Sequence, residues 1–176
     1  MSSANHILDA AELRMREQGY NAVSFRDIAS DVGIKSASLH YHFPKKADLG
    51  LALVARYAEN FQSVLITETR LDPDPSNSIQ VFIDLHRRAL KDQGLLCLCA
   101  VFGAEAKGLP ENVTQGVRAF FKSNIEWLAS AYEKAGVKNP SSRAKAGVAA
   151  LEGALMVALV NEDYSVFEAV ADMVRL

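Results

Sequence analysis

Apolar residues recur three and four positions apart along most of the chain, and short runs of turn residues separate these patterns. This spacing predicts α-helices. The predicted helices cover a short segment between Ser24 and Gly33 and residues 4–18, 36–42, 46–69, 76–92, 96–106, 110–135, 140–161 and 164–175. Asp72-Pro73-Asp74-Pro75 predicts a break. No segment alternates as a β-strand does, so the sequence predicts an all-α protein of about nine helices.

The segment from Ser24 to His42 predicts two short helices joined by a tight turn. Ser24 and Asp27 have the spacing of a capping box, and Gly33 supplies the positive φ that a sharp turn requires. The second helix offers only Leu39 to a core. A helix with one core residue and a polar, partly aromatic outer face suits the major groove of DNA. There, the base edges present hydrogen-bond donors and acceptors.

Several side chains in and beside this second helix are candidates for DNA contact. Ser36 is expected to cap the helix, and one of the three consecutive rings at 40–42 is expected to pack inward beside Leu39. Arg26 places a cation in a first helical turn, which predicts an external anion or, alternatively, a solvated side chain. The candidate DNA-binding residues are Arg26, Lys35, Ser36, Ala37, Ser38, His40, Tyr41, His42 and Lys46.

The same region resembles the DNA-binding domain of the TetR family of bacterial repressors. The matching segments, in order, are Ile7-Leu8-Asp9-Ala10-Ala11, Gly19-Tyr20, Ile28-Ala29, Val32-Gly33, Ser38-Leu39, His42-Phe43 and Lys46-Ala47-Asp48-Leu49. The resemblance implies a helix-turn-helix domain at 1–48, a helical ligand-binding and dimerisation domain at 49–176, and a phosphate contact at Lys46. It also implies a homodimer that binds a palindromic double-stranded DNA operator and a small-molecule effector. Lys35 and His40 depart from the family pattern, so the operator sequence does not carry over.

Charge and composition add little to this interpretation. The 176 residues have a formal net charge of −2, so DNA binding depends on the placement of cations around the second short helix. The most apolar run, 154–160, is far shorter than the ~20 residues that span a bilayer, and no membrane partner is expected. No signal peptide is recognised, and two cysteines form no disulfide framework, so a cytoplasmic location is expected.

The C-terminal helices supply candidates for an effector pocket and a dimer interface. Each pocket candidate has a plain core alternative, and the two polar ones need partners. The pocket candidates are Phe61, Phe82, His86, Phe102, Asn124 and Trp127. The small and apolar faces of the last two helices predict an intermolecular four-helix bundle, with packing inside one chain as the alternative. The interface candidates are Gly147, Ala150, Leu151, Ala154, Leu155, Ala158, Phe167 and Val170.

Other functions receive weaker support. Cys97 and Cys99 lie near a predicted helix N-terminus, which permits a redox- or electrophile-responsive regulator, although their apolar neighbours favour buried, inert thiols. His40 and His42 point to different faces of a helix, so no metal site is expected there, and no cofactor is expected either. No phosphate loop, nucleophile elbow or zinc-protease motif is found, so an enzyme is not expected. An activator and a non-enzymatic helical adaptor remain alternatives to a repressor.

Overall fold

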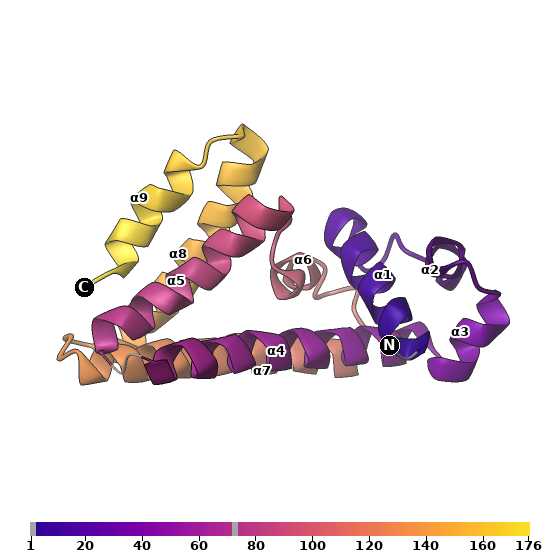
Figure 1. Cartoon of the computed structure of the whole chain (residues 1–176), viewed down its shortest axis with the longest axis horizontal. Coiled ribbons are helices and arrows are strands. Elements are labelled where there is room, and N and C mark those ends of the chain that lie inside the picture. The colour runs from indigo at the N-terminus through magenta and orange to yellow at the C-terminus, as the bar shows by residue number, and fades with distance from the viewer. Residues whose placement is uncertain (1–2, 72–73) are drawn as a thin grey trace. The chain divides into compact units, whose positions relative to one another are not determined.

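The structure is a computed structural model that describes residues 3–71 and 74–176 (Figure 1). Within these residues the chain forms nine helices and no strand. They are α1 (Ser3–Gln18), α2 (Phe25–Val32), α3 (Ser36–His42), α4 (Lys46–Leu71), α5 (Pro75–Gln93), α6 (Leu98–Ala104), α7 (Glu111–Lys134), α8 (Pro140–Asn161) and α9 (Ser165–Val174). The all-α prediction is confirmed. Of the predicted break, Asp72 and Pro73 lie outside the described residues, whereas Asp74 caps α5 and Pro75 begins it.

The chain divides into two compact units. The first unit comprises residues 1–58 and 98–119, and the second comprises 59–97 and 120–176. Sequence analysis expected a single division after residue 48. The structure groups the chain differently because α6 packs against α1, which assigns a distant segment to the N-terminal unit. The long helices α4 and α7 each contribute residues to both units.

The first unit is organised around the apolar stripe of α1. Ile7, Ala11 and Met15 are fully buried, as the helical spacing predicted. They lie under α2, which buries Ile28 and Ala29. Gly19 ends α1 with a φ of 88°, a conformation that side chains other than glycine rarely adopt. This core holds the short helices α2 and α3 in place.

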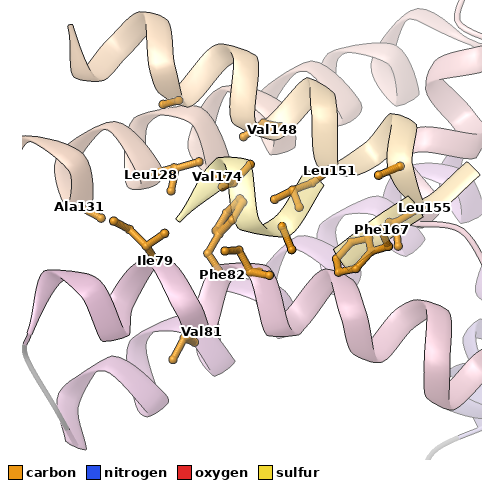
Figure 2. Packing of buried hydrophobic residues seen from close by; sticks show 14 of the residues in the cluster. Ile79, Val81, Phe82, Leu128, Ala131, Val148, Leu151, Leu155, Phe167 and Val174 are labelled. Carbon is orange, nitrogen blue, oxygen red and sulfur yellow. The ribbon is translucent and has the colours of Figure 1, made fainter. Parts of the chain in front are cut away.

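The second unit is built from α5, α8 and α9 packed on the C-terminal part of α7 (Figure 2). Phe82 of α5, Leu151 and Leu155 of α8, and Phe167 of α9 are all buried in one cluster. Figure 2 shows Phe82 and Ile79 pointing from α5 toward α8 and α9. Full burial of a Phe or Leu side chain contributes about 1.5–3 kcal/mol, so this cluster is the main source of stability of the unit.

The length and apolar composition of α8 raise the question of whether it could span a membrane. By length and composition alone its 22 residues would suffice to cross a membrane. However, 39% of the apolar window is buried inside the chain, where α8 packs against α5 and α9. A single helix of this length and composition is weak evidence for a membrane segment, since core helices of globular proteins share both properties.

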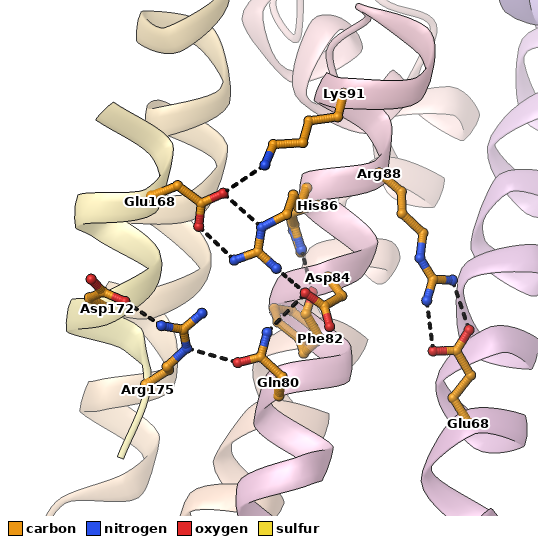
Figure 3. Close-up of polar contacts among 11 residues, drawn as sticks. Glu68, Gln80, Phe82, Asp84, His86, Arg88, Lys91, Glu168, Asp172 and Arg175 are labelled. Atoms are coloured by element: carbon orange, nitrogen blue, oxygen red, sulfur yellow. Dashed lines mark hydrogen bonds and ion pairs between the residues drawn. The ribbon is translucent and has the colours of Figure 1, made fainter. Parts of the chain in front are cut away.

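A polar network joins α5 to α9 on the surface of the second unit (Figure 3). Glu168 of α9 accepts hydrogen bonds from Arg87 at 2.9 and 2.8 Å and from Lys91 at 3.2 Å. Arg87 also pairs with Asp84, one turn earlier on the same helix. The bidentate Arg87 pair lowers the pKa of Glu168 from 4.5 to about 2, so this carboxylate is charged in all but strongly acid solution.

Candidate nucleic-acid interface

The turn between α2 and α3 follows directly from local sequence. Ser24 caps α2: its hydroxyl accepts from the Asp27 N–H at 3.3 Å, while the Asp27 carboxylate accepts from the Ser24 N–H at 2.8 Å. Gly33 ends the helix in the left-handed region with a φ of 72°, and the Ile34 N–H donates back to the Ala29 carbonyl at 2.9 Å. The capping box and the glycine turn are therefore confirmed.

α3 is anchored through one side chain. Leu39 is fully buried and is the only buried residue of the helix. Tyr41 is 84% exposed, while Ala37, Ser38 and His40 are also exposed and Ser36 and His42 are half-buried. Most of the helix surface is therefore available to a partner.

Two expectations about α3 are corrected by the structure. Ser36 is the first residue of the helix and not its cap; Lys35 holds the cap position, without a side-chain hydrogen bond. None of the three consecutive rings is buried. Leu39 is fully buried, and Phe43, directly after the helix, is buried in place of a ring of the helix, so the three rings remain at the surface.

The rings of α3 are ordered by contacts along the surface. The His40 ring lies 4.8 Å from the ring of Phe25, and its Nδ1 lies 3.3 Å from the Pro44 carbonyl oxygen, which can only accept. Nδ1 is therefore the protonated nitrogen in this contact, which leaves Nε2 at the surface. Tyr41 and His42 pack edge to face at 5.3 Å. These contacts limit the rotamers of side chains that are otherwise free to meet another molecule.

Cations flank α3 on both sides. Arg26 and Lys35 are exposed, and within residues 3–71 and 74–176 neither makes an ion pair. Lys46, the first residue of α4, is different: its Nζ donates to the Asn21 carbonyl at 3.3 Å and lies 4.5 Å from the centre of the Tyr20 ring. Burial lowers the pKa of Lys46, and the charge of Glu105 opposes this.

Glu105 is a residue of this region that sequence analysis did not identify. Its carboxylate accepts hydrogen bonds from the backbone N–H groups of Tyr20 at 2.7 Å and Asn21 at 3.2 Å. A Cβ on Gly19 would lie 2.8 Å from Oε1 of this carboxylate, so a larger residue there would displace the Glu105 side chain. Glu105 thus fixes the loop that holds Lys46. No sequence signal was available, because the partners are 85 and 84 residues apart.

The predicted effector residues fall in both units. Phe61, Phe82, His86, Asn124 and Trp127 belong to the second unit, where Phe82 stacks on Trp127 at 5.6 Å and Phe61 lies 5.6 Å from His86. Phe102 belongs to the first unit, where it is buried with its ring 5.4 Å from that of Tyr20, because α6 packs against α1.

The two polar candidates of the second unit are both buried. His86 is 3% exposed, and its Nδ1 lies 2.9 Å from the Phe82 carbonyl oxygen. Asn124 is fully buried, and its Oδ1 accepts from Gln62 at 3.2 Å. Glu152 of α8, which sequence analysis missed, lies 3.8 Å from His86 Nε2. Among apolar neighbours in a helix, one Glu gave no periodic signal.

The structure also locates the cysteines and the interface candidates. Cys97 and Cys99 are both buried and neither forms a disulfide, so the redox alternative gains no support. Six interface candidates are buried in the core of a single chain and cannot meet a second copy. They are Gly147, Leu151, Ala154, Leu155, Ala158 and Phe167. Ala150 is exposed and Val170 half-exposed. α8 carries apolar residues on more than one side, so spacing alone does not select the face that would meet a second copy.

Comparison with known proteins identifies two matching family models. Residues 7–53 match the model described as bacterial regulatory proteins, tetR family. Residues 75–173, more than half of the chain, match the model described as transcriptional regulator LmrA/YxaF-like, C-terminal domain.

Similar structures and a similar curated protein agree with these models. A TetR transcriptional regulator from Legionella pneumophila has 31% identity and a TM-score of 0.93, with 99% of this chain and 96% of that chain covered. A TetR-family regulator from Agrobacterium tumefaciens has 30% identity and a TM-score of 0.91, with 97% and 95% covered. The transcriptional regulator AcuR of Cereibacter sphaeroides is 26% identical over 102 residues, and the match spans 56% of this chain but only 46% of that relative.

Proposed function

The chain belongs to the TetR family of bacterial regulatory proteins and is a DNA-binding transcriptional regulator; we propose that it acts as a homodimeric repressor that a small-molecule effector releases from its operator. The observation that carries this proposal is the surface of α3. The helix is held by Leu39 alone, and its other side chains, Tyr41 above all, face outward. A protein core does not require such a helix, whereas a major groove accepts one.

We assign different roles to the side chains at this surface. Ala37, Ser38, His40 and Tyr41 are exposed on α3 and would meet base edges, with Ala37 offering only an apolar contact such as a thymine methyl. The half-buried residues Ser36 and His42 would lie at the margin of the contact. Arg26, Lys35 and Lys46 surround the helix and would bind phosphates, which fix orientation without reading sequence.

We propose that dimerisation uses the exposed face of α8 and α9, which contains Ala150 of the interface candidates but not the six buried ones. The residues exposed there are apolar, and no other part of the chain that the structure describes covers them. They are Ala150, Gly153, Met156, Val157, Val160 and Met173. A twofold pair of α3 helices would read two half-sites, which a single short helix cannot do with useful specificity.

The repressor proposal is tested with labelled DNA from the region beside the encoding gene. Wild-type protein should shift this DNA at moderate salt, and Tyr41→Ala should weaken specific binding about tenfold, since a lost base contact costs roughly 1–3 kcal/mol. Tyr41 is 84% exposed, so the Tyr41→Ala protein should have the melting temperature of the wild type. Leu13→Ala, a substitution at an exposed position of α1, is the control. Wild-type affinity in folded Tyr41→Ala would contradict the assignment.

The dimer proposal needs its own measurement. Val160 is 76% exposed, so Val160→Asp should leave the monomer folded while placing a charge in the proposed interface. Sedimentation should then show a monomer with much weaker operator binding. Lys138→Asp changes an exposed position outside α8 and α9 and should remain dimeric. A dimeric Val160→Asp would place the interface elsewhere. Reporter transcription measured with and without the protein distinguishes a repressor from an activator. The regulator is expected in the cytoplasm.

A further inference from the structure

The interior of the second unit contains a buried carboxyl group, that of Glu152, whose hydrogen-bonding capacity the rest of the unit does not satisfy. Both oxygens of Glu152 are closed to solvent and have no nitrogen or oxygen partner among the described residues. Their polar neighbours are the thiol of Cys97, a weak donor, and Nε2 of His86 at 3.8 Å, beyond hydrogen-bond reach. Nδ1 of His86 is already engaged by the Phe82 carbonyl. Each unsatisfied polar group of this kind costs about 1–3 kcal/mol.

The basic side chains of α5 do not serve as counter-ions for Glu152. Arg87 and Lys91 bind Glu168, and Arg88 forms a bidentate pair with Glu68 at 2.7 and 3.0 Å. Burial therefore raises the pKa of Glu152 well above its usual value; the Cys97 thiol raises it further, and His86 lowers it. Burial without a counter-ion thus disfavours the charged form of this carboxyl group, and a bound cation would favour it.

A second polar group in the same unit is also incomplete. Asn124 is fully buried and its Nδ2 has no partner, although its Oδ1 accepts from Gln62. Exchanging the oxygen and nitrogen of this amide would leave Oδ1 without a partner instead, so one polar atom is unsatisfied in either assignment. Gln62 follows Phe61 in α4, and Asn124 lies one turn after Phe120 in α7.

The groups around these polar atoms are aromatic. The Phe61 ring lies 5.6 Å from the His86 ring and 5.5 Å from Phe120, while Phe82 lies 4.8 Å from His86 and stacks on Trp127. Phe61 and Trp127 are only half-buried. Aromatic faces attract organic cations, and a buried carboxylate adjacent to them supplies the opposite charge.

We propose that the effector is a small organic cation, a protonated amine on an apolar or aromatic body, whose ammonium group binds Glu152 and whose body packs against Phe61, Phe82 and Trp127. This inference rests on the proposed function, because it assigns a chemical class to the effector of that regulator. An ammonium group donates up to three hydrogen bonds, and neither oxygen of the Glu152 carboxylate has a nitrogen or oxygen partner among the described residues. A neutral hydroxyl of the same shape donates only one hydrogen bond and carries no charge, and an anionic ligand would be repelled.

Trp127 is the single tryptophan of the chain, so its fluorescence reports binding in this unit directly. The protein is titrated with three ligands of similar size: 2-phenylethylamine, 2-phenylethanol and phenylacetate. The amine should bind at least about tenfold more tightly than the alcohol, with no binding of the carboxylate, and should release wild-type protein from its DNA. Glu152→Gln keeps the side-chain shape without the charge and should abolish the preference for the amine. Glu133→Gln, at an exposed position of α7, is the matched control.

Each outcome bears on one proposal. Equal binding of amine and alcohol, binding of none of the three ligands, or an amine preference that survives in Glu152→Gln would overturn the cation inference. If these results come from protein that still binds operator DNA, the regulator proposal stands; failure of the wild type to bind DNA would count against that proposal instead. Circular dichroism establishes that Glu152→Gln is folded, and Glu152→Leu, which removes the buried polar group, provides a second folded variant that should also lose the amine preference.

Discussion

Replacing Glu105 with alanine should destabilise the protein and loosen the loop between α1 and α2. In the wild type, one carboxylate accepts from the Tyr20 N–H at 2.7 Å and from the Asn21 N–H at 3.2 Å. A hydrogen bond to a charged acceptor contributes about 1.5–3 kcal/mol, and the longer, exposed bond contributes roughly 0.5 kcal/mol. Tyr20 is 3% exposed, so its N–H has little access to water as a replacement. The free energy of unfolding should therefore fall by about 2–3 kcal/mol.

Urea denaturation at one fixed protein concentration measures this change, because dimer stability depends on concentration. Glu105→Gln keeps one acceptor oxygen and should lose only about 1 kcal/mol, whereas Glu133→Ala, an exposed change, should lose less than about 0.5 kcal/mol. Hydrogen exchange gives a local readout: the amides of Tyr20 and Asn21 should exchange faster in Glu105→Ala. An unfolding free energy within about 0.5 kcal/mol of wild type would refute the reasoning that this carboxylate holds the loop.

Three further outcomes are expected. Lys46→Ala should weaken binding to specific and non-specific DNA alike and reduce the slope of log K against log salt by about 0.9 per subunit; an unchanged slope would show that Lys46 does not bind phosphate. Ser24→Ala removes the cap of α2 and should lower the unfolding free energy by roughly 1 kcal/mol in urea denaturation, while Ser24→Thr should largely preserve it. Arg87 lowers the pKa of Glu168 to about 2, so the ionised carboxylate stabilises the folded protein. This stabilisation is present above pH ~4.5 and is lost as the pH falls toward 2. Because this side chain is 37% exposed, solvent screening reduces the contribution to about 1–2 kcal/mol, and thermal melts of Glu168→Gln should show a flatter acid dependence than wild type.

The sequence predicted what depends on neighbouring residues. The helices, the capping box at Ser24 and the turn at Gly33 all follow from local spacing and local hydrogen bonds, and each is confirmed. The outward face of α3 follows from the same reasoning, because Leu39 is the single apolar residue at a core position.

What the sequence could not predict depends on long-range packing. Glu105 acts through backbone groups in another part of the chain, and Glu152 meets its neighbours only after α8 packs against α5. Phe102 is a candidate for either a pocket or a core by sequence, because spacing does not distinguish the two, and the structure places it in the first unit. The face of α8 was ambiguous for a physical reason: small and apolar residues surround the helix, so periodicity gives no direction.

The single anchor of α3 affects how this regulator can diverge. Six of its seven residues contribute no buried side chain, so substitutions there should change the preferred binding sequence while the fold is retained. After gene duplication, two copies can then acquire different target genes through a few surface changes. For the same reason, the outer face of another such helix can be transplanted onto Leu39 to redirect this protein to a chosen promoter.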